Sequence, residues 1–332
     1  MFDLHDLTSH LLESVVAGTI LLALLCNYVG TRVNKGKALA WWEQVRPLLE
    51  KEFFSVGIPD ASSPTGLDAR GKDEFAGYAS GRVGIRSADL KLMLAPRHLP
   101  TVWLMDAVTG FLFDQKDVGD RFTLTLTTAD GADGERTHYD GCVFALVHKS
   151  SMQQWRKQRY DLSLTRTADH AALPPWMAVM SESSEITQAL LPDLPGLQDQ
   201  RGLYYLLASD LPAMAPSKLE EWRRQKRITV YAAMGRDDVA LVRAAIALAD
   251  ALVRKGHFRQ EVLRRLQTTR EEEERRVRRL DEEEKRAELE KKKAAQRKEQ
   301  KGHVAKLPAE EQRKALEKER ERQQRRRQRV QK

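Results

Sequence analysis

A cysteine and a histidine, Cys142 and His148, stand six positions apart in the stretch THYDGCVFALVH. A cysteine nucleophile needs a histidine in direct contact to activate its thiol. We predict that this stretch is a strand, and side chains six residues apart on a strand face the same side but lie about 20 Å from each other. The pair is therefore predicted to be a packed core cysteine and an edge histidine.

The other candidate motifs are explained by local structure. Asp237 and Asp238 precede a helical pattern and suit a helix N-terminus, and the segments SGRVG (80–84) and MSESSE (180–185) are typical of turns. The sequence contains no HExxH, no paired CxxC, no Walker A loop and no GxSxG motif. Two cysteines cannot form a framework of several disulfides. We predict no catalytic residues, no metal site and no cofactor, and we expect a protein that is not an enzyme.

Basic side chains gather towards the end of the sequence. Residues 259–332 contain 27 Lys and Arg against 17 Asp and Glu, about +10 in net charge, so the rest of the chain, from a total of +8, carries about −2. The candidates for phosphate contacts are Arg320, Arg322, Arg325, Arg326, Arg327 and Arg329. Such side chains can displace counterions from RNA without reading its sequence, but no Phe, Tyr or Trp follows Phe258 to stack on bases. Contact with RNA and a solvated charged spacer both remain open.

The segment that carries these arginines, 258–332, is predicted to form a charged helical tail. Glu, Arg, Lys, Gln, Ala and Leu dominate it, and acidic and basic residues fall three or four positions apart. Its apolar positions are too sparse for a sustained heptad seam, so a single solvated helix is favoured over a self-associating coiled coil. We expect an interruption at 302–308, which contains Gly302 and Pro308.

An apolar run near the N-terminus, residues 11–30, reads LLESVVAGTILLALLCNYVG. Twenty helical residues are about 30 Å long, the thickness of a hydrocarbon core. A cleaved signal peptide is disfavoured because the first 31 residues contain no Lys or Arg. We therefore predict one membrane-spanning helix over 11–31. Gly18 and Asn27 within it either pack on a partner helix or face lipid.

The charges on either side of this run differ in sign. Acidic residues precede it, whereas Arg32, Lys35 and Lys37 follow it directly. The positive-inside rule places Arg32 onward in the cytoplasm and leaves residues 1–10 as a short luminal stub.

The middle of the chain, 38–257, is predicted to be a cytosolic α+β domain, because strand-like and helix-like patterns alternate along it. A helix is expected at 38–54, and Pro47 is expected to kink or split it. Other helices are expected at 100–113, 151–161, 184–191 with Ser184 as its cap, and 237–255 with Asp237 as its cap. Further strands are expected within 75–94 and at 177–182, 203–208 and 228–233.

The clearest hairpin joins two segments of the middle region. RFTLTLTT (121–128) alternates with a period of two, and the turn ADGADGE (129–135) supplies two glycines. THYDGCVFALVH (137–148) is then predicted to be the returning strand. We expect the two strands to pair directly.

Several segments together resemble a known family. They are NYVGTRVNKGKALAWWEQVRPLLEKEFFSVG (27–57), YASGRVGIRSADLKL (78–92), AVMSESSEIT (178–187) and the Lys-, Glu- and Arg-rich tail with its proline-containing interruption. The chain is similar to the calumin family, coiled-coil-domain proteins of the endoplasmic reticulum that form the PAT complex with a small membrane partner, Asterix.

The resemblance implies a non-enzymatic subunit of an intramembrane chaperone beside the Sec translocon, which assists nascent multi-pass membrane proteins. It also implies a cytosolic body under the ribosome and a basic tail whose arginines at 320–329 contact ribosomal RNA. Animal relatives carry a long acidic luminal segment linked to calcium, whereas this sequence has only Asp3 and Asp6 in its stub. Calcium binding is therefore not carried over from the resemblance. The alternative function is a structural tether or adaptor of the endoplasmic reticulum membrane.

Overall fold

The computed structural model describes residues 4–59, 61, 63–113, 119–129, 137–194, 196–197 and 199–305. These residues fall into two units. The first comprises the described residues up to 215 together with 222–270, and it is an α+β domain with a long N-terminal helix. The second comprises 216–221 and the described residues from 271 onward, and it is helical.

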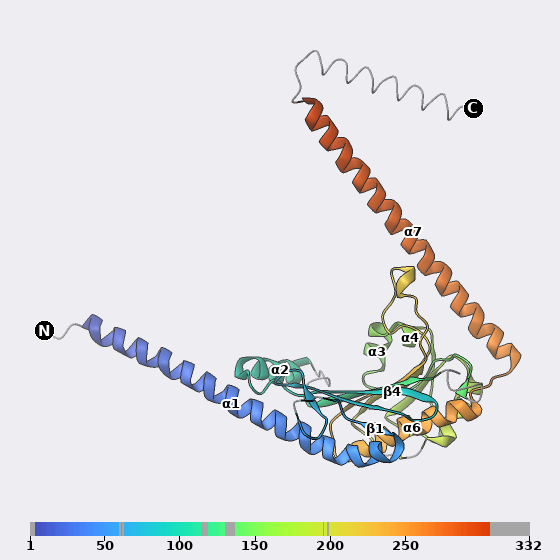
Figure 1. Ribbon diagram of the computed structural model, residues 1–332, viewed down its shortest axis with the longest axis horizontal. Helices are drawn as coiled ribbons and strands as arrows, with labels where there is room; N and C mark the ends of the chain where they lie inside the picture. The colour runs from blue at the N-terminus through green and yellow to red at the C-terminus, as the bar shows by residue number, and fades with distance from the viewer. Residues whose placement is uncertain are drawn as a thin grey trace. The chain divides into compact units, whose positions relative to one another are not determined.

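Helix α1, Leu4–Glu52, is one continuous helix of 49 residues (Figure 1). The side chains of residues 14–25 are exposed. From Gly30 onward, by contrast, every third or fourth residue is buried, namely Gly30, Asn34, Ala38, Trp41, Trp42, Val45 and Leu49. This spacing places the buried residues on one face of the helix. The segment predicted as a span, 11–31, and the helix predicted at 38–54 therefore belong to one helix, because the amphipathic part of α1 continues the apolar part without interruption.

Of the two alternatives expected at Pro47, a kink or a split, the split does not occur, since the helix continues to Glu52. Proline removes one backbone hydrogen bond, and the carbonyl left without a partner belongs to Glu43, four residues earlier. Both Pro47 and Glu43 are exposed. Water can therefore satisfy that carbonyl, and the buried face of the helix is not disturbed.

Among the described residues, ten strands form one sheet in which every pairing is antiparallel. The strands are β1 Ser55–Val56, β2 Asp68–Ala69, β3 Glu74–Ser80, β4 Ile85–Met93, β5 Arg121–Thr128, β6 Phe144–His148, β7 Arg166–Ala168, β8 Met177–Ser181, β9 Leu203–Ser209 and β10 Arg227–Ala233. Their order is β1-β3-β4-β5-β10-β9-β6-β8-β7, and β2 pairs with β3 beside this path.

The remaining helices are α2 Pro100–Phe113, α3 Met152–Gln158, α4 Tyr160–Ser163, α5 Ser184–Leu190, α6 Asp238–Lys255 and α7 Gln260–Ala305, with short 3-10 turns at Leu191–Asp193 and Leu219–Glu221. The α+β fold expected from the sequence is confirmed. The helix expected at 151–161 is divided at Arg159, whose backbone is extended. The interruption expected at 302–308 does not begin at Gly302, because α7 includes Gly302 and runs to Ala305, and residues 306–308 lie outside the described part of the chain.

Of the two predicted helix caps, one differs from the structure by one residue and the other has the predicted position. Helix α5 is capped by Ser183, whose hydroxyl accepts a hydrogen bond from the backbone N–H of Glu185, and Ser184 is its first helical residue. At α6, Asp237 occupies the cap position without a side-chain bond. The carboxylate of Asp238 instead accepts hydrogen bonds from the Gly235 N–H, at 2.8 Å, and from the Trp41 indole, at 2.6 Å.

The predicted hairpin is wrong. Strand β5 pairs with β4 and β10, whereas β6 pairs with β8 and β9, so two strands separate them in the sheet. The reason is burial: residues 143–147 are buried on both faces, whereas Thr123, Thr125 and Thr127 leave one face of β5 only half-buried. A strand buried on both faces belongs in the middle of a sheet covered on both sides. The turn residues 130–136 lie outside the described part of the chain.

Two apolar clusters cover the two faces of the sheet. The larger one combines Trp41, Trp42 and other residues of α1 with the apolar side of α6 and with the inward side chains of the sheet, such as Phe122. The smaller one lies over β6 and β9 on the other face, where Trp155 of α3 packs among tyrosines. Trp41 contacts the Phe122 ring at 4.9 Å and bonds Asp238, so α1 is held to the sheet and to α6 together.

Gly30 lies where α1 first meets the body of this unit. A Cβ atom at this position would come within 2.4 Å of the backbone carbonyl oxygen of Arg97 and 2.5 Å of the backbone nitrogen of His98. Such an approach is possible only for glycine, because a backbone cannot rotate away as a side chain does. Gly36, on the same helix, has nothing within 4 Å of its Cβ position.

We expect Gly30→Ala to destabilise the protein by about 1–3 kcal/mol, the usual cost of overpacking a tight contact. The matched control, Gly36→Ala, should stabilise it by about 0.5–1 kcal/mol, because alanine favours a helix interior over glycine. Thermal unfolding of the full chain in mild detergent measures both. Equal effects of the two substitutions would contradict the close contact at Gly30.

Candidate membrane junction and root of the charged helix

The three basic residues expected to set membrane orientation have different surroundings. Arg32 and Lys35 are exposed, and the Arg32 guanidinium lies 3.5 Å from the Tyr28 hydroxyl one turn earlier. The Lys37 ammonium instead forms a 2.8 Å ion pair with Asp120 of the body. Asn27 accepts a hydrogen bond from Lys72 at 2.9 Å, so its side chain contacts the body of the chain.

A polar cluster, which we call the junction cluster, joins α1 to the loop after β4. It consists of Asn34, Lys37, Arg97 and Asp120. Asn34 is fully buried, and its amide donates to the carbonyls of Ala95 and Lys72, at 3.1 and 3.2 Å, while its carbonyl oxygen accepts from Arg97 at 3.0 Å. Arg97 also donates two hydrogen bonds to the Asp120 carboxylate, of 2.7 and 2.9 Å.

Asp120 receives more donors than any other member of the junction cluster. Besides Arg97 and Lys37, the backbone N–H of Ala95 donates to it at 3.0 Å. Burial favours the neutral carboxyl, but the hydrogen bonds from Arg97, Lys37 and Ala95 outweigh it and lower the pKa of Asp120 to about 2. Its ionised form therefore ties α1, the 95–97 loop and the start of β5 together at neutral pH.

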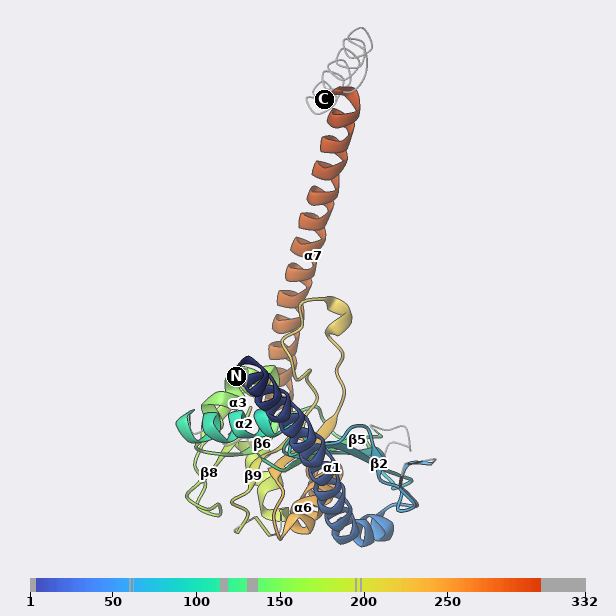
Figure 2. The same ribbon diagram turned by 90° about the vertical axis from the view of Figure 1, so that its left-hand side faces the viewer.

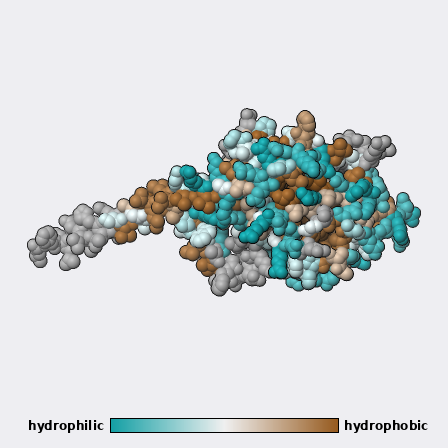
Figure 3. Space-filling view, turned by 90° about the horizontal axis from the view of Figure 1, so that it is seen from below, coloured by the Kyte–Doolittle hydropathy of each residue, from teal (hydrophilic) through white to brown (hydrophobic). Residues whose placement is uncertain are grey.

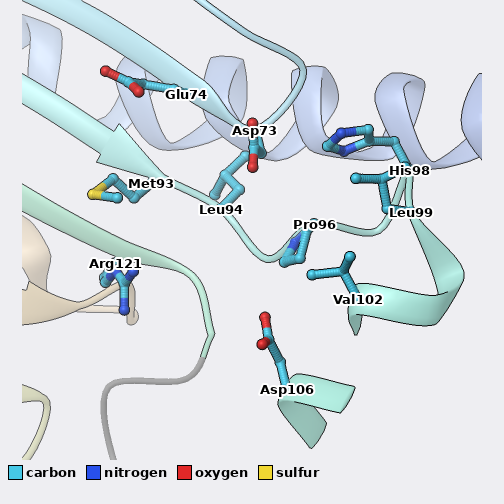
Figure 4. Close-up of a pocket in the computed structure, with 10 residues that line it drawn as sticks. All are labelled: Asp73, Glu74, Met93, Leu94, Pro96, His98, Leu99, Val102, Asp106 and Arg121. Atoms are coloured by element: carbon cyan, nitrogen blue, oxygen red, sulfur yellow. The ribbon is translucent and has the colours of Figure 1, made fainter. Parts of the chain in front are cut away.

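A pocket of about 330 Å³ lies beside this junction, between the start of α2 and the edge of the sheet (Figure 4). Apolar side chains line one part of it, among them Met93, Leu99 and Val102. Asp106 of α2 and Arg121 of β5 line another part, and the Asp106 carboxylate points into the pocket (Figure 4).

A second buried polar group, which we call the root cluster, holds the first turns of α7. Arg270 is 4% exposed. Its guanidinium donates two hydrogen bonds to the Glu182 carboxylate, at 2.5 and 2.8 Å, and two to the Asp210 carboxylate, at 2.7 and 3.2 Å. Arg224 adds a 2.8 Å bond to Asp210. Glu182 also accepts the backbone N–H of Val143 at 2.8 Å. Because two cations face two carboxylates, the buried charges are compensated.

The root cluster also affects the protonation state of the Cys142 thiol. Burial is the largest cause that raises the pKa of its thiol well above the usual value, and the nearby charges of Asp210 and Glu182 raise it further. For Asp210, burial acts to raise the pKa, but the hydrogen bonds and charges of Arg270 and Arg224 outweigh it and lower the pKa. Cys142 is thus a buried neutral thiol just before β6, and His148 bonds Ser150 at the other end of that strand.

Beyond Arg270, five basic side chains of α7 have acidic partners within the helix. Ion pairs join Arg275 to Glu271, Arg276 to Glu273, Arg278 to Glu274, Lys285 to Asp281 and Arg286 to Glu282. The six arginines that we expected to contact phosphate, Arg320 to Arg329, lie outside the described residues. In the described part of the chain, no group of three or more His, Cys, Asp or Glu side chains could hold a metal ion.

Apart from Lys37, no member of either cluster was among the predicted site residues, although both clusters leave a trace in the sequence. Asn34 lies four residues after Gly30 and four before Ala38, in phase with the buried face of α1. Arg270 lies four residues after Leu266, in phase with the apolar face at the start of α7. A polar residue at an apolar helical position indicates a buried polar network, but its partners are distant in sequence and cannot be identified from spacing.

We expect Asp120→Asn to lower the stability of the protein at neutral pH and to remove part of its acid sensitivity. The pKa of Asp120 is lower in the folded state than in the unfolded state. The ionised carboxylate therefore contributes its full share of the free energy of unfolding above about pH 4, and this share is lost as the pH falls towards about 2. Unfolding scans of both proteins from pH 7 to pH 2 should converge at the acidic end. Parallel curves would contradict this role for Asp120.

Arg270→Leu should destabilise the protein by about 3–5 kcal/mol, because it leaves Glu182 and Asp210 buried without their main cation. Arg265→Leu, on the exposed side of the same helix, should change stability by less than about 0.5 kcal/mol. Adding Glu182→Gln and Asp210→Asn to Arg270→Leu should restore part of the loss. Chemical unfolding of the four proteins measures these effects, and additive losses would contradict a shared network.

The comparison with known protein families gives one match along nearly the whole chain. The family described as PAT complex subunit CCDC47 matches residues 9–326. The junction cluster and the root cluster both lie within this range. The match agrees with the resemblance drawn from the sequence segments and confirms it.

Individual relatives support the same conclusion. The chain is 27% identical over 290 residues to a UPF0674 endoplasmic reticulum membrane protein of Schizosaccharomyces pombe, which covers 81% of this chain and 75% of the relative. A UPF0674 endoplasmic reticulum membrane protein of Saccharomyces cerevisiae is 23% identical, and the match covers 63% of this chain and 57% of the relative. PAT complex subunit CCDC47 of Bos taurus is 25% identical over 60% of this chain and 41% of its own length, so the chain spans less than half of that relative. The chain belongs to the PAT complex subunit CCDC47 family.

Proposed function

We propose that this protein is a non-enzymatic subunit of an intramembrane chaperone complex in the endoplasmic reticulum membrane. It assists the biogenesis of nascent multi-pass membrane proteins beside the Sec translocon. The family match over residues 9–326 carries this proposal. The relatives' own names support it, since two are endoplasmic reticulum membrane proteins and others are subunits of the PAT complex.

In this proposal α1 anchors the protein with its N-terminus in the lumen and its body in the cytosol. Among the described residues, α1 is the one helix long and apolar enough to cross a membrane. Its projecting half has an apolar surface (Figure 3). Arg32 and Lys35 follow that surface and are exposed, as cytosolic anchoring charges would be. The small partner in the membrane is an Asterix-like protein, by analogy with the family.

The basic end of the chain is proposed to contact ribosomal RNA. Residues 271–290 carry 10 acidic against 6 basic residues, about −4 in net charge, whereas residues 291–332 carry 17 basic against 6 acidic, about +11. The positive charge is therefore concentrated beyond Glu290. Arg320, Arg322, Arg325, Arg326, Arg327 and Arg329 are the proposed contacts with phosphate.

A second candidate function is a tether in which the charged helix spans a distance and contacts protein only. The internal ion pairs of α7 favour it, because a helix that neutralises its own charges is soluble without a partner. The two functions differ in what they require of the arginines beyond Glu290.

Replacing Arg325, Arg326 and Arg327 together by Glu should weaken ribosome binding of the full-length protein. If the three arginines contact phosphate, the slope of log binding constant against log salt should fall by about 2–3. The matched control replaces Arg275, Arg278 and Arg286, which have the same charge but already pair with Glu271, Glu274 and Glu282. Co-sedimentation with purified ribosomes over a range of salt concentrations measures both.

The control variant should bind ribosomes as the parent does. Unchanged binding by both variants would exclude the contact with ribosomal RNA and favour the tether. Equal weakening by both would mean that overall charge matters and that the three arginines have no particular role.

A further inference from the structure

Helix α2 exposes its apolar side chains to an unusual degree. Val102, Trp103, Leu104, Met105 and Val108 are between 42% and 66% exposed. At 100° per residue these positions point in nearly all directions around the helix axis. A soluble helix normally buries such side chains or confines them to one face. The described side chains of α2 do neither, so this surface requires a cover.

The length of α2 limits what that cover can be. A helix of 14 residues is about 21 Å long, which is too short to cross a hydrocarbon core of about 30 Å. A helix of this kind can instead lie in the boundary between lipid headgroups and acyl chains, where apolar side chains insert by about 5–10 Å.

The contacts of the preceding loop place α2 beside the end of the apolar half of α1. The backbone of Arg97 and His98 touches Gly30, and Asn34 bonds the Ala95 carbonyl. Only two residues separate His98 from Thr101, so the start of α2 lies within about 10 Å of this contact. Figures 1 and 2 show α2 beside α1, at the edge of the body from which the N-terminal half of α1 projects.

The single charged residue of α2 supports this placement. Asp106 is half-buried. It lines the same pocket as Arg121 of the body (Figure 4). The exposed positions carry no charge. They include Trp103 in the first turn, and tryptophan is enriched where a membrane meets water.

We propose that α2 lies in the cytosolic boundary of the same bilayer that α1 crosses, with Trp103, Leu104, Met105 and Val108 among phospholipid acyl chains near the headgroups. The proposal rests on the anchoring of α1 given above. Gly30 and the junction cluster then fix α2 at the depth where α1 leaves the hydrocarbon. The body contacts the membrane through two helices, α1 and α2, and therefore cannot rotate freely about α1.

Quenching of fluorophores by lipids tests this placement in the full-length protein, reconstituted alone into phosphatidylcholine nanodiscs. Three proteins carry one reactive cysteine each: Cys26 itself on α1, Leu104→Cys with Cys26→Ala on α2, and Val83→Cys with Cys26→Ala as a control, since Val83 is an apolar residue that is 79% exposed on the body. Cys142 is buried and does not react in the folded state. The lipids carry a nitroxide either near the headgroup or near the end of the acyl chain.

The label at position 104 should be quenched by the shallow nitroxide at least about twofold more than the label at 83, and more by the shallow than by the deep nitroxide. The label at Cys26 should be quenched by lipid as well. If the label at 104 behaves like the label at 83 while Cys26 is quenched, the proposal for α2 fails and the anchoring stands, and a protein partner becomes the better cover for α2. If neither is quenched, the anchoring of α1 fails too.

A charge substitution provides an independent check that does not depend on a label's preference for lipid. Met105→Glu should reduce the quenching at position 104 to the level seen at 83, because a carboxylate resists insertion among acyl chains. Met214→Glu, at an apolar residue that is 81% exposed elsewhere on the body, should leave it unchanged. Equal thermal midpoints of the two variants would show that both are folded, and unchanged quenching in Met105→Glu would overturn the proposal.

Discussion

At Gly30 the surface of α1 changes from mostly exposed and apolar to packed against a protein core, and the helix backbone meets the backbone of residues 97–98 there without any side chain between them. Close backbone packing is rigid, because neither partner can yield by changing a rotamer. The junction cluster surrounds this contact with hydrogen bonds to Asn34 and charges on Asp120. The position of α2, of the pocket beside it and of the whole sheet relative to the apolar half of α1 depends on this one contact.

The root cluster has a similar construction at the other end of the domain. Arg270 bonds two carboxylates, Glu182 directly after β8 and Asp210 directly after β9, so the first turns of α7 are tied to the ends of these two strands. A guanidinium can satisfy both carboxylates because its donors form a rigid fork. The packed half of α1 and the first turns of α7 are therefore each joined to the first unit by buried polar and charged groups. This suits a protein whose proposed work is done by surfaces at a distance from its core.

The proposed function distributes its tasks along the chain. The apolar half of α1 and helix α2 supply surfaces suited to lipid, and the net charge of about +11 beyond residue 290 supplies one suited to RNA. The domain between them has an ordinary core, in which α1 and α6 cover one face of the sheet and α3 covers part of the other. Its part in the proposed function is to connect and orient the membrane-facing and ribosome-facing segments.

The sequence by itself determined the apolar run, the charge difference across it, the charged helix and most strands and helices, because each depends on residues that are near neighbours in the chain. It also carried the family resemblance, through segments such as 78–92 and 178–187. It failed for the hairpin, since β5 and β6 are separated by β10 and β9, which come much later in the chain. Only the tertiary structure decided that pairing, the partners of Asn34 and Arg270, and the exposure of α2. The physical reason is common to all of them: burial and buried charge compensation join residues that are distant in sequence, and no local pattern records which distant residue is the partner.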